Sequence, residues 1–127
     1  MAARGRLICA SAALAEGGTG VRFALAPGAG EEKGFAIRHE GVVRAYVNRC
    51  PHLGVELDWQ PGEFFDMTGL YLVCSTHGAL FEPATGHCVA GPCRGASLER
   101  LAVEERNGQV HIPDDRSARR PTGREDP

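Results

Sequence analysis

Glycine and proline interrupt this chain at short intervals. Its 127 residues include 17 Gly and 8 Pro, which leaves few uninterrupted stretches long enough for an ordinary helix. Short segments rich in alternating or β-branched residues lie between these interruptions, and such segments form strands. Many short strands at close spacing predict an all-β fold, either a sandwich or a barrel.

The expected strands are joined by recognisable turns. His39-Glu40-Gly41 predicts a hairpin between two of them, and Asn107-Gly108 predicts another because both residues tolerate positive φ. Pro83-Ala84-Thr85-Gly86 carries the same kind of turn chemistry. The predicted strands cover residues 21–25, 34–38, 42–47, 70–73, 79–81, 87–89, 101–104 and 110–112.

The length of the chain allows one domain with a single core. We assign this domain to residues 1–113. From residue 114 the composition becomes polar and charged, with Ala118 as its one aliphatic residue, so we expect residues 114–127 to form a disordered tail. No stretch approaches the roughly 18 consecutive apolar residues of a membrane span. The formal net charge of -2 also argues against a nucleic-acid partner.

Cysteine and histidine are conspicuous in so small a chain, with five of each. An odd number of cysteines cannot pair completely into disulfides. The amino-terminal segment is a poor secretory signal, since residues 7–15 are mostly Ala and are interrupted by Ser11. We therefore expect a reducing, cytoplasmic location, where clustered Cys and His more often bind metal or carry out redox chemistry.

Two loops each combine one cysteine with one histidine. Cys50-Pro51-His52 follows one predicted strand, and Cys74-Ser75-Thr76-His77 follows another. Two strand ends can bring these four side chains together as ligands of one metal centre. Zinc accepts two Cys and two His, although its usual loops pair like with like. A [2Fe-2S] cluster with Cys on one iron and His on the other is the alternative, and it explains why each loop mixes the two types.

These residues resemble the Rieske-type [2Fe-2S] ferredoxins and the Rieske domains of larger oxidoreductases. The resemblance is carried by Cys50-Pro51-His52-Leu53-Gly54 and Cys74-Ser75-Thr76-His77-Gly78, with Gly91-Pro92 matching the family's proline loop. It implies an antiparallel β-sandwich with a small two-loop cluster-binding subdomain at one end. It also implies one [2Fe-2S] cluster per chain, with Cys50 and Cys74 on the inner iron and His52 and His77 on the outer iron.

Two departures from the family pattern bear on the cluster. The connection between His52 and Cys74 is a few residues longer than usual, and the excess in residues 56–69 could cap the cluster or shape a docking surface. Val55 and Thr76 stand where high-potential members have disulfide-forming cysteines, so no loop disulfide is expected.

The residues expected near the cluster also bear on its reduction potential. Ala79 and Phe81 stand where high-potential members carry hydroxyl donors. Hydrogen bonds to cluster sulfurs raise the potential, so we expect the low end of the Rieske range, roughly -150 mV or slightly lower.

The other cysteines and the aromatic residues of the long connection have simpler interpretations. Cys88 and Cys93 could form a redox disulfide or a second metal pair, but two packed thiols flanking a tight turn are favoured. Cys9 is expected to be a buried small apolar residue. Trp59, Phe64 and Phe65 are expected to pack beneath the long connection rather than bind a ligand.

The function that follows is one-electron transfer rather than catalysis. The chain has no Gly-x-Gly-x-x-Gly nucleotide loop, no nucleophile with a matching base and no two-His, one-carboxylate iron site. We expect a carrier between a reductase and an oxygenase or other terminal oxidoreductase, with Leu53, Leu80 and Pro92 around the docking edge. The alternatives are an accessory subunit of the kind found as the small subunit of nitrite reductase, and a redox-sensing or zinc-stabilised interaction module.

Overall fold

The computed structural model describes residues 6–25, 33–51, 54–58, 60–76 and 78–112, and the backbone of 119–120. Nearly all regular structure within these ranges is β, as predicted, apart from the short 3-10 helix η2 (Ser11–Ala13). The strands are β1 (Arg6–Ala10), β2 (Val21–Ala24), β3 (Lys33–His39), β4 (Val42–Val47), β5 (Leu72–Val73), β6 (Leu80–Phe81), β7 (Cys88–Ala90), β8 (Arg100–Leu101), β9 (Glu104–Arg106), β10 (Gln109–Ile112) and β11 (Arg119–Arg120).

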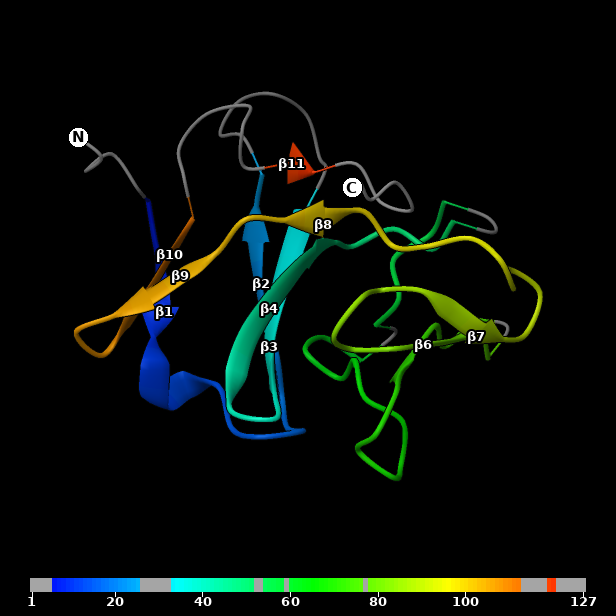
Figure 1. Ribbon diagram of the computed structural model, residues 1–127, viewed down its shortest axis with the longest axis horizontal. Helices are drawn as coiled ribbons and strands as arrows, with labels where there is room; N and C mark the ends of the chain where they lie inside the picture. The colour runs from blue at the N-terminus through cyan, green and yellow to red at the C-terminus, as the bar shows by residue number, and fades with distance from the viewer. Residues whose placement is uncertain are drawn as a thin grey trace.

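The described residues form three antiparallel sheets (Figure 1). The central sheet has the order β11-β8-β4-β3-β2, and the sheet β1-β10-β9 lies on one side of it. The small sheet β5-β6-β7 and its loops lie on the other side, at the right of Figure 1. This arrangement confirms the predicted antiparallel β-sandwich with a small subdomain at one end. We call the part formed by residues 48–98 the loop subdomain.

The two predicted hairpins form as expected. β3 and β4 pair from Gly34↔Val47 to His39↔Val42, and Glu40 and Gly41 turn between them with φ of 54° and 78°. β9 and β10 pair across Asn107 and Gly108, whose φ values of 54° and 75° are those of a tight hairpin turn.

Strands β3 and β4 bury both of their faces, because alternate side chains point to opposite sides of a sheet. One face joins an aliphatic core with the β1-β10-β9 sheet, and the other joins a core within the loop subdomain. The buried residues of the aliphatic core are Leu14, Ala36, Val43, Ala45, Val47, Leu101 and Val110. Those of the second core are Phe35, Ile37, Tyr46, Cys50, Leu57, Phe64, Leu72, Cys74, Ala79, Phe81, Cys88, Cys93 and Leu98.

Two strand predictions need correction. Residues 101–104 were expected to form one strand, but β8 ends at Leu101 and β9 begins at Glu104. β8 pairs with β4 in the central sheet and β9 with β10 in the other, so the intervening residues cross between sheets and cannot pair in either. The strand expected at 70–73 is shortened to Leu72–Val73, because Asp66 accepts backbone hydrogen bonds that hold the preceding residues in a turn.

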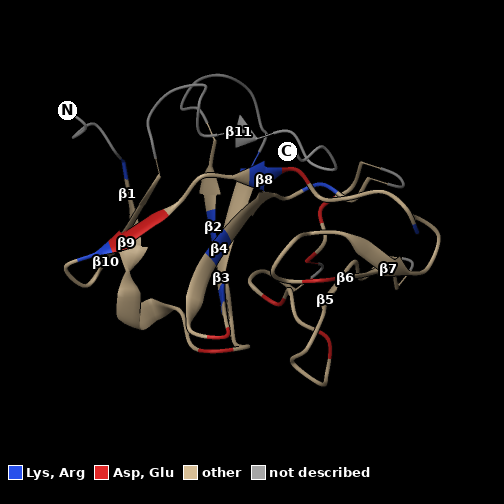
Figure 2. Ribbon diagram, viewed as in Figure 1, with Lys and Arg blue, Asp and Glu red and all other residues tan. Residues whose placement is uncertain are grey.

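The ends of the chain lie largely outside the described residues. Of the tail predicted at 114–127, the structure describes only the backbone of β11, which pairs with β8. Within the described part, no helix is long and apolar enough to cross a membrane. Basic and acidic residues are scattered along the ribbon in both parts of the molecule in Figure 2.

Candidate metal centre

The two predicted cysteine loops are built from the same turn. In each, the cysteine N–H donates to the carbonyl five residues ahead: Cys50 to Val55 at 2.6 Å and Cys74 to Ala79 at 2.9 Å. In each, the glycine four residues after the cysteine donates its N–H back to the cysteine carbonyl, at 2.7 Å for Gly54 and 2.8 Å for Gly78. The hydrogen bonds that close the two turns therefore match, position for position.

Glycine is required at the end of both turns. Gly54 has φ of 76° and Gly78 has φ of 74°, in the left-handed region that side chains disfavour. A Cβ would find open space at Gly78, so the requirement there is conformational rather than steric. The repeated Cys-x-x-x-Gly spacing thus encodes the repeated turn, which could be read from the sequence.

Both cysteines of these loops are buried and neither forms a disulfide. Cys50 is 2% exposed and Cys74 is 1% exposed, and both belong to the core of the loop subdomain. Buried sulfur ligands on two matched turns suit an iron–sulfur cluster, whose inner iron is held by thiolates away from solvent. The described residues therefore fit the thiolate half of the predicted site.

The histidine half of the site lies outside the described residues. His52 and His77 occupy positions that the structure leaves undescribed, as do Leu53 and Trp59. The hydrogen bonds of the two matched turns join Cys50 to Gly54 and Val55, and Cys74 to Gly78 and Ala79, across these positions. The assignment of His52 and His77 as ligands therefore stays a prediction.

A third loop packs against both cysteine loops. Gly91 follows β7, and a Cβ at this position would lie 2.7 Å from the Cα of Ala79, so only glycine permits the close approach to the second loop. Two residues later, Cys93 places its Sγ 3.8 Å from the Sγ of Cys50 in the first loop. Sequence reasoning identified Gly91-Pro92 as the proline loop but gave no signal for this sulfur contact.

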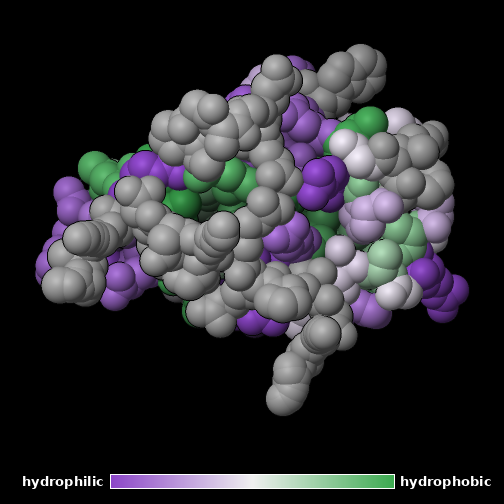
Figure 3. All heavy atoms as spheres, turned by 90° about the horizontal axis from the view of Figure 1, so that it is seen from above, coloured by the Kyte–Doolittle hydropathy of each residue, from purple (hydrophilic) through white to green (hydrophobic). Residues whose placement is uncertain are grey.

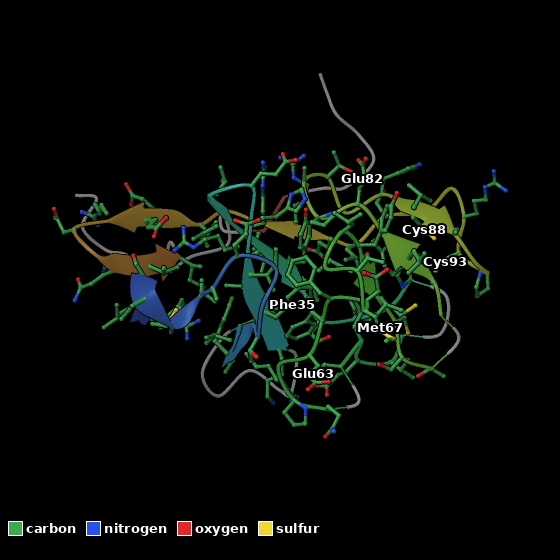
Figure 4. The ribbon with its side chains drawn as sticks, turned by 90° about the horizontal axis from the view of Figure 1, so that it is seen from below. Phe35, Glu63, Met67, Glu82, Cys88 and Cys93 are labelled. Carbon is green, nitrogen blue, oxygen red and sulfur yellow. The ribbon has the colours of Figure 1, made fainter. Side chains whose placement is uncertain are left out.

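Cys88 and Cys93 are free, as favoured from the sequence, and both are buried. Figure 4 shows them on β7 and the turn that follows it. The Cys88 thiol donates to the Ala90 carbonyl of its own strand at 3.2 Å. Burial is the main cause, and the neighbouring Cys50 the second, of a Cys93 pKa raised to about 12. Cys93 therefore keeps its proton at neutral pH.

A buried polar network supports the first loop from behind. Asn48, two residues before Cys50, donates from Nδ2 to Asp58 Oδ1 at 2.9 Å and accepts from the Leu57 N–H at 2.9 Å. Asp58 Oδ2 accepts from the Gly62 N–H at 2.9 Å and lies 3.5 Å from Arg22 Nε on β2. The entry and exit of this loop are thus tied to each other and to the central sheet.

The long connection packs against the second loop and into the core. The Leu57 carbonyl accepts from the Ser75 N–H at 3.0 Å, and the Phe64 carbonyl accepts from the Val73 N–H at 2.8 Å. The Phe64 ring stacks on Phe35, with centroids 3.9 Å apart and planes 10° apart. Phe64 and Phe65 therefore pack beneath the connection as predicted. Met67 is fully exposed at its tip.

Ala79 and Phe81 lie next to the second loop and are completely buried. Neither side chain carries a hydroxyl, so neither can donate the hydrogen bonds that raise the potential in high-potential members. Cys9 lies far from these loops on β1 and packs against the aliphatic core. It is half-buried rather than buried as predicted, because no residue of β1 is fully covered.

Comparison with known proteins decides between the two metal chemistries left open by the spacing. The model of the Rieske [2Fe-2S] domain matches residues 7–110. The chain belongs to the Rieske [2Fe-2S] domain family. Its cofactor is accordingly one [2Fe-2S] cluster rather than zinc.

Individual relatives of this Rieske domain are either larger or of the same size. Oxidoreductase NdmD of Pseudomonas putida is 32% identical over 88 residues, 64% of this chain, but the chain spans only 14% of that protein's length. The ferredoxin of carbazole 1,9a-dioxygenase from Nocardioides aromaticivorans IC177 has a TM-score of 0.68 at 19% identity, over 89% of this chain and 100% of that one. The Sphingomonas yanoikuyae B1 ferredoxin has a TM-score of 0.66 at 23% identity, over 86% and 97%. These two structures share the fold of this chain.

Proposed function

We propose that this Rieske domain is a one-electron carrier between a reductase and an oxygenase or another terminal oxidoreductase. The observation that carries this proposal is the pair of matched turns that present Cys50 and Cys74 at one end of a family domain. A chain with the fold and nearly the whole length of two ferredoxins suits a carrier better than a catalyst. Its enzymatic role would then be that of a component in an oxidoreductase system.

We assign the four ligands as the sequence pattern predicts. Cys50 and Cys74 hold the inner iron through buried thiolates, and His52 and His77 hold the outer iron. When bound, the cluster supplies reversible uptake of one electron. The chain's own contribution is to bury the thiolates and to exclude water from their side.

The surroundings of the cysteine loops favour a low reduction potential. Ala79 and Phe81 provide no hydroxyl donors, so reduction is stabilised less than in high-potential members. We expect a midpoint near the low end of the Rieske range, roughly -150 mV or slightly lower.

The docking edge would surround the histidine positions. Pro92 is exposed and Leu80 is half-buried beside the loops, while Leu53 lies outside the described residues. The loop subdomain, at the right of Figure 3, shows pale and green residues between purple ones. Because the net charge is small, partner choice would depend on local shape at this edge more than on long-range steering.

A second role uses the same site. A larger relative, in which the matched region is 14% of the length, is consistent with an accessory role within a bigger oxidoreductase. Under either role we place the protein in the cytoplasm, since none of its described cysteines forms a disulfide. A redox sensor would differ from both roles by reacting slowly with electron-transfer partners.

Stopped-flow reduction tests the carrier role. Anaerobic protein is mixed with a flavin reductase and then with an oxygenase in its resting state, and the visible absorption of the cluster is followed. A carrier accepts and returns one electron per chain on the timescale of enzyme turnover. Matched reactions with Cys50→Ser protein show no such absorption change. Reduction or reoxidation much slower than turnover with every partner would reject the carrier role and favour sensing.

A further inference from the structure

The thiol of Cys93 lies within hydrogen-bonding distance of Cys50, one of the predicted cluster ligands. Its Sγ is 3.8 Å from that of Cys50, within reach of a sulfur hydrogen bond, and the two residues are separated by 43 positions in the chain. Cys93 is 6% exposed, so water does not compete for its thiol. The contact is held by the tight packing of Gly91 on Ala79, which fixes the turn carrying Cys93.

The direction of the hydrogen bond follows from the chemistry of the ligand. Cys50 as an iron ligand is a thiolate and has no proton, so Cys93 must be the donor. Cys88, on the preceding strand, already donates its own thiol proton to the Ala90 carbonyl. Between the neutral Cys88 sulfur and the charged Cys50 sulfur, the charged one is the stronger acceptor for the Cys93 proton.

We propose that Cys93 is a positioning residue for the cluster, whose thiol donates an S–H···S hydrogen bond to the Cys50 ligand and raises the reduction potential. This inference rests on the proposed function, because it takes Cys50 to be an iron ligand. Reduction makes the ligand sulfur more negative, so the hydrogen bond is stronger in the reduced state and favours it. Cys93 thereby partly offsets the missing hydroxyls at Ala79 and Phe81.

Substitutions separate a hydrogen bond from simple packing. Cys93→Val fills the space without a donor, Cys93→Ala leaves a gap without a donor, and Cys93→Ser keeps a donor. We expect the midpoint potential to fall in the Val and Ala variants alike, and to stay closer to the wild-type value in the Ser variant. Cys9→Ala removes a thiol from the other core and should leave the midpoint unchanged.

Infrared spectroscopy of the wild-type protein provides a second test that needs no variant to load a cluster. The Cys93 S–H stretching band should move to lower frequency when the cluster is reduced, because its acceptor gains negative charge. Bands from Cys9 and Cys88, which donate elsewhere or lie far away, should not move. A wild-type spectrum in which no S–H band responds to reduction would overturn the inference.

The outcomes also distinguish this inference from the proposed function. A Cys93→Val midpoint equal to wild type, with a normal cluster in both proteins, overturns the hydrogen bond and leaves the carrier role intact. A midpoint potential that falls in the Cys93→Ala variant but not in the Cys93→Val variant also overturns the hydrogen bond, because packing alone then sets the potential. Wild-type protein without any [2Fe-2S] cluster would overturn the proposed function and this inference together.

Discussion

The two faces of the β3-β4 hairpin bury different kinds of side chain. Toward the β1-β10-β9 sheet the hairpin presents Ala36, Val43, Ala45 and Val47, and toward the loop subdomain it presents Phe35, Ile37 and Tyr46. The first core is aliphatic and is closed by regular strands on both sides. The second combines aromatic rings with four cysteines and is closed mainly by loops.

From this difference we expect the loop subdomain, and not the sandwich core, to depend on the cofactor. Strand pairing and aliphatic burial stabilise the sandwich core. The loop subdomain has only the short strands β5, β6 and β7 among its described residues, and bound metal supplies it with additional cross-links. We therefore expect the two cores to respond differently to the same perturbations.

Removal of a thiolate ligand should have the largest effect. Cys50→Ser or Cys74→Ser should lose nearly all bound iron and the visible absorption, because two thiolates are needed on the inner iron. Hydrogen exchange followed by mass spectrometry should then show lost protection in residues 54–98 and retained protection in β1 and β10.

A matched substitution tests this contrast. Cys9→Ser changes a cysteine of the sandwich core and should leave iron content unchanged. Equal loss of protection in both cores after ligand removal would contradict the division of the molecule into a cofactor-dependent and a cofactor-independent part.

Among substitutions that leave the ligands intact, truncation of Phe64 should cause the largest loss of stability. Phe64→Ala removes a fully buried ring stacked on Phe35, which should lower the free energy of unfolding by about 3–5 kcal/mol. Chemical denaturation measures this loss. Cluster release should begin at lower denaturant concentration than in wild type. A loss below about 1 kcal/mol would mean that this contact does not hold the loop subdomain to the sheet.

Loss of the Tyr46 hydroxyl should lower the free energy of unfolding by less than the Phe64 truncation. It acts at the same place, where the loop subdomain packs on the central sheet. Tyr46 is buried, which raises the pKa of its phenol well above the usual range, and its hydroxyl donates to the Pro83 carbonyl at 2.6 Å. Tyr46→Phe should cost about 1–2 kcal/mol, because the carbonyl loses its partner away from water. Thermal unfolding of the loaded protein checks this value, and an unchanged midpoint temperature would count against the bond.

Acidification should have the smallest effect of these perturbations, and its effect falls on the sandwich side. Backbone hydrogen bonds from Gly41 and Glu40 lower the pKa of Glu16, and the Arg38 hydrogen bond lowers that of Glu105. A carboxyl with a lowered folded-state pKa stabilises the protein above its unfolded value of 4.5, and this contribution is lost as pH falls further.

Denaturation of the metal-free protein as a function of pH measures this effect. Stability should be flat from pH 7 to about 5 and should decline below that range. Glu16→Gln should reduce the slope of the decline. Stability that increases on acidification through this range would contradict the lowered pKa values of Glu16 and Glu105.

The sequence predicts the sandwich and the cysteine loops well for physical reasons. Alternating strands and the Asn107-Gly108 turn are local signals, and the Cys-x-x-x-Gly spacing encodes a local turn. The contact of Cys93 with Cys50 joins residues far apart in the chain, so no local pattern reports it. The break between β8 and β9 likewise depends on which sheet each segment joins.

Pulsed electron paramagnetic resonance of the dithionite-reduced protein tests the ligand assignment most directly. If Cys50, Cys74, His52 and His77 hold one [2Fe-2S] cluster, the reduced spectrum should show couplings to two directly bound imidazole nitrogens. His52→Cys or His77→Cys protein, if it assembles a cluster, should lose one of the two couplings. A reduced cluster without any coupling to a directly bound nitrogen would contradict the assignment of the two histidines and with it the Rieske-type ligation of this site.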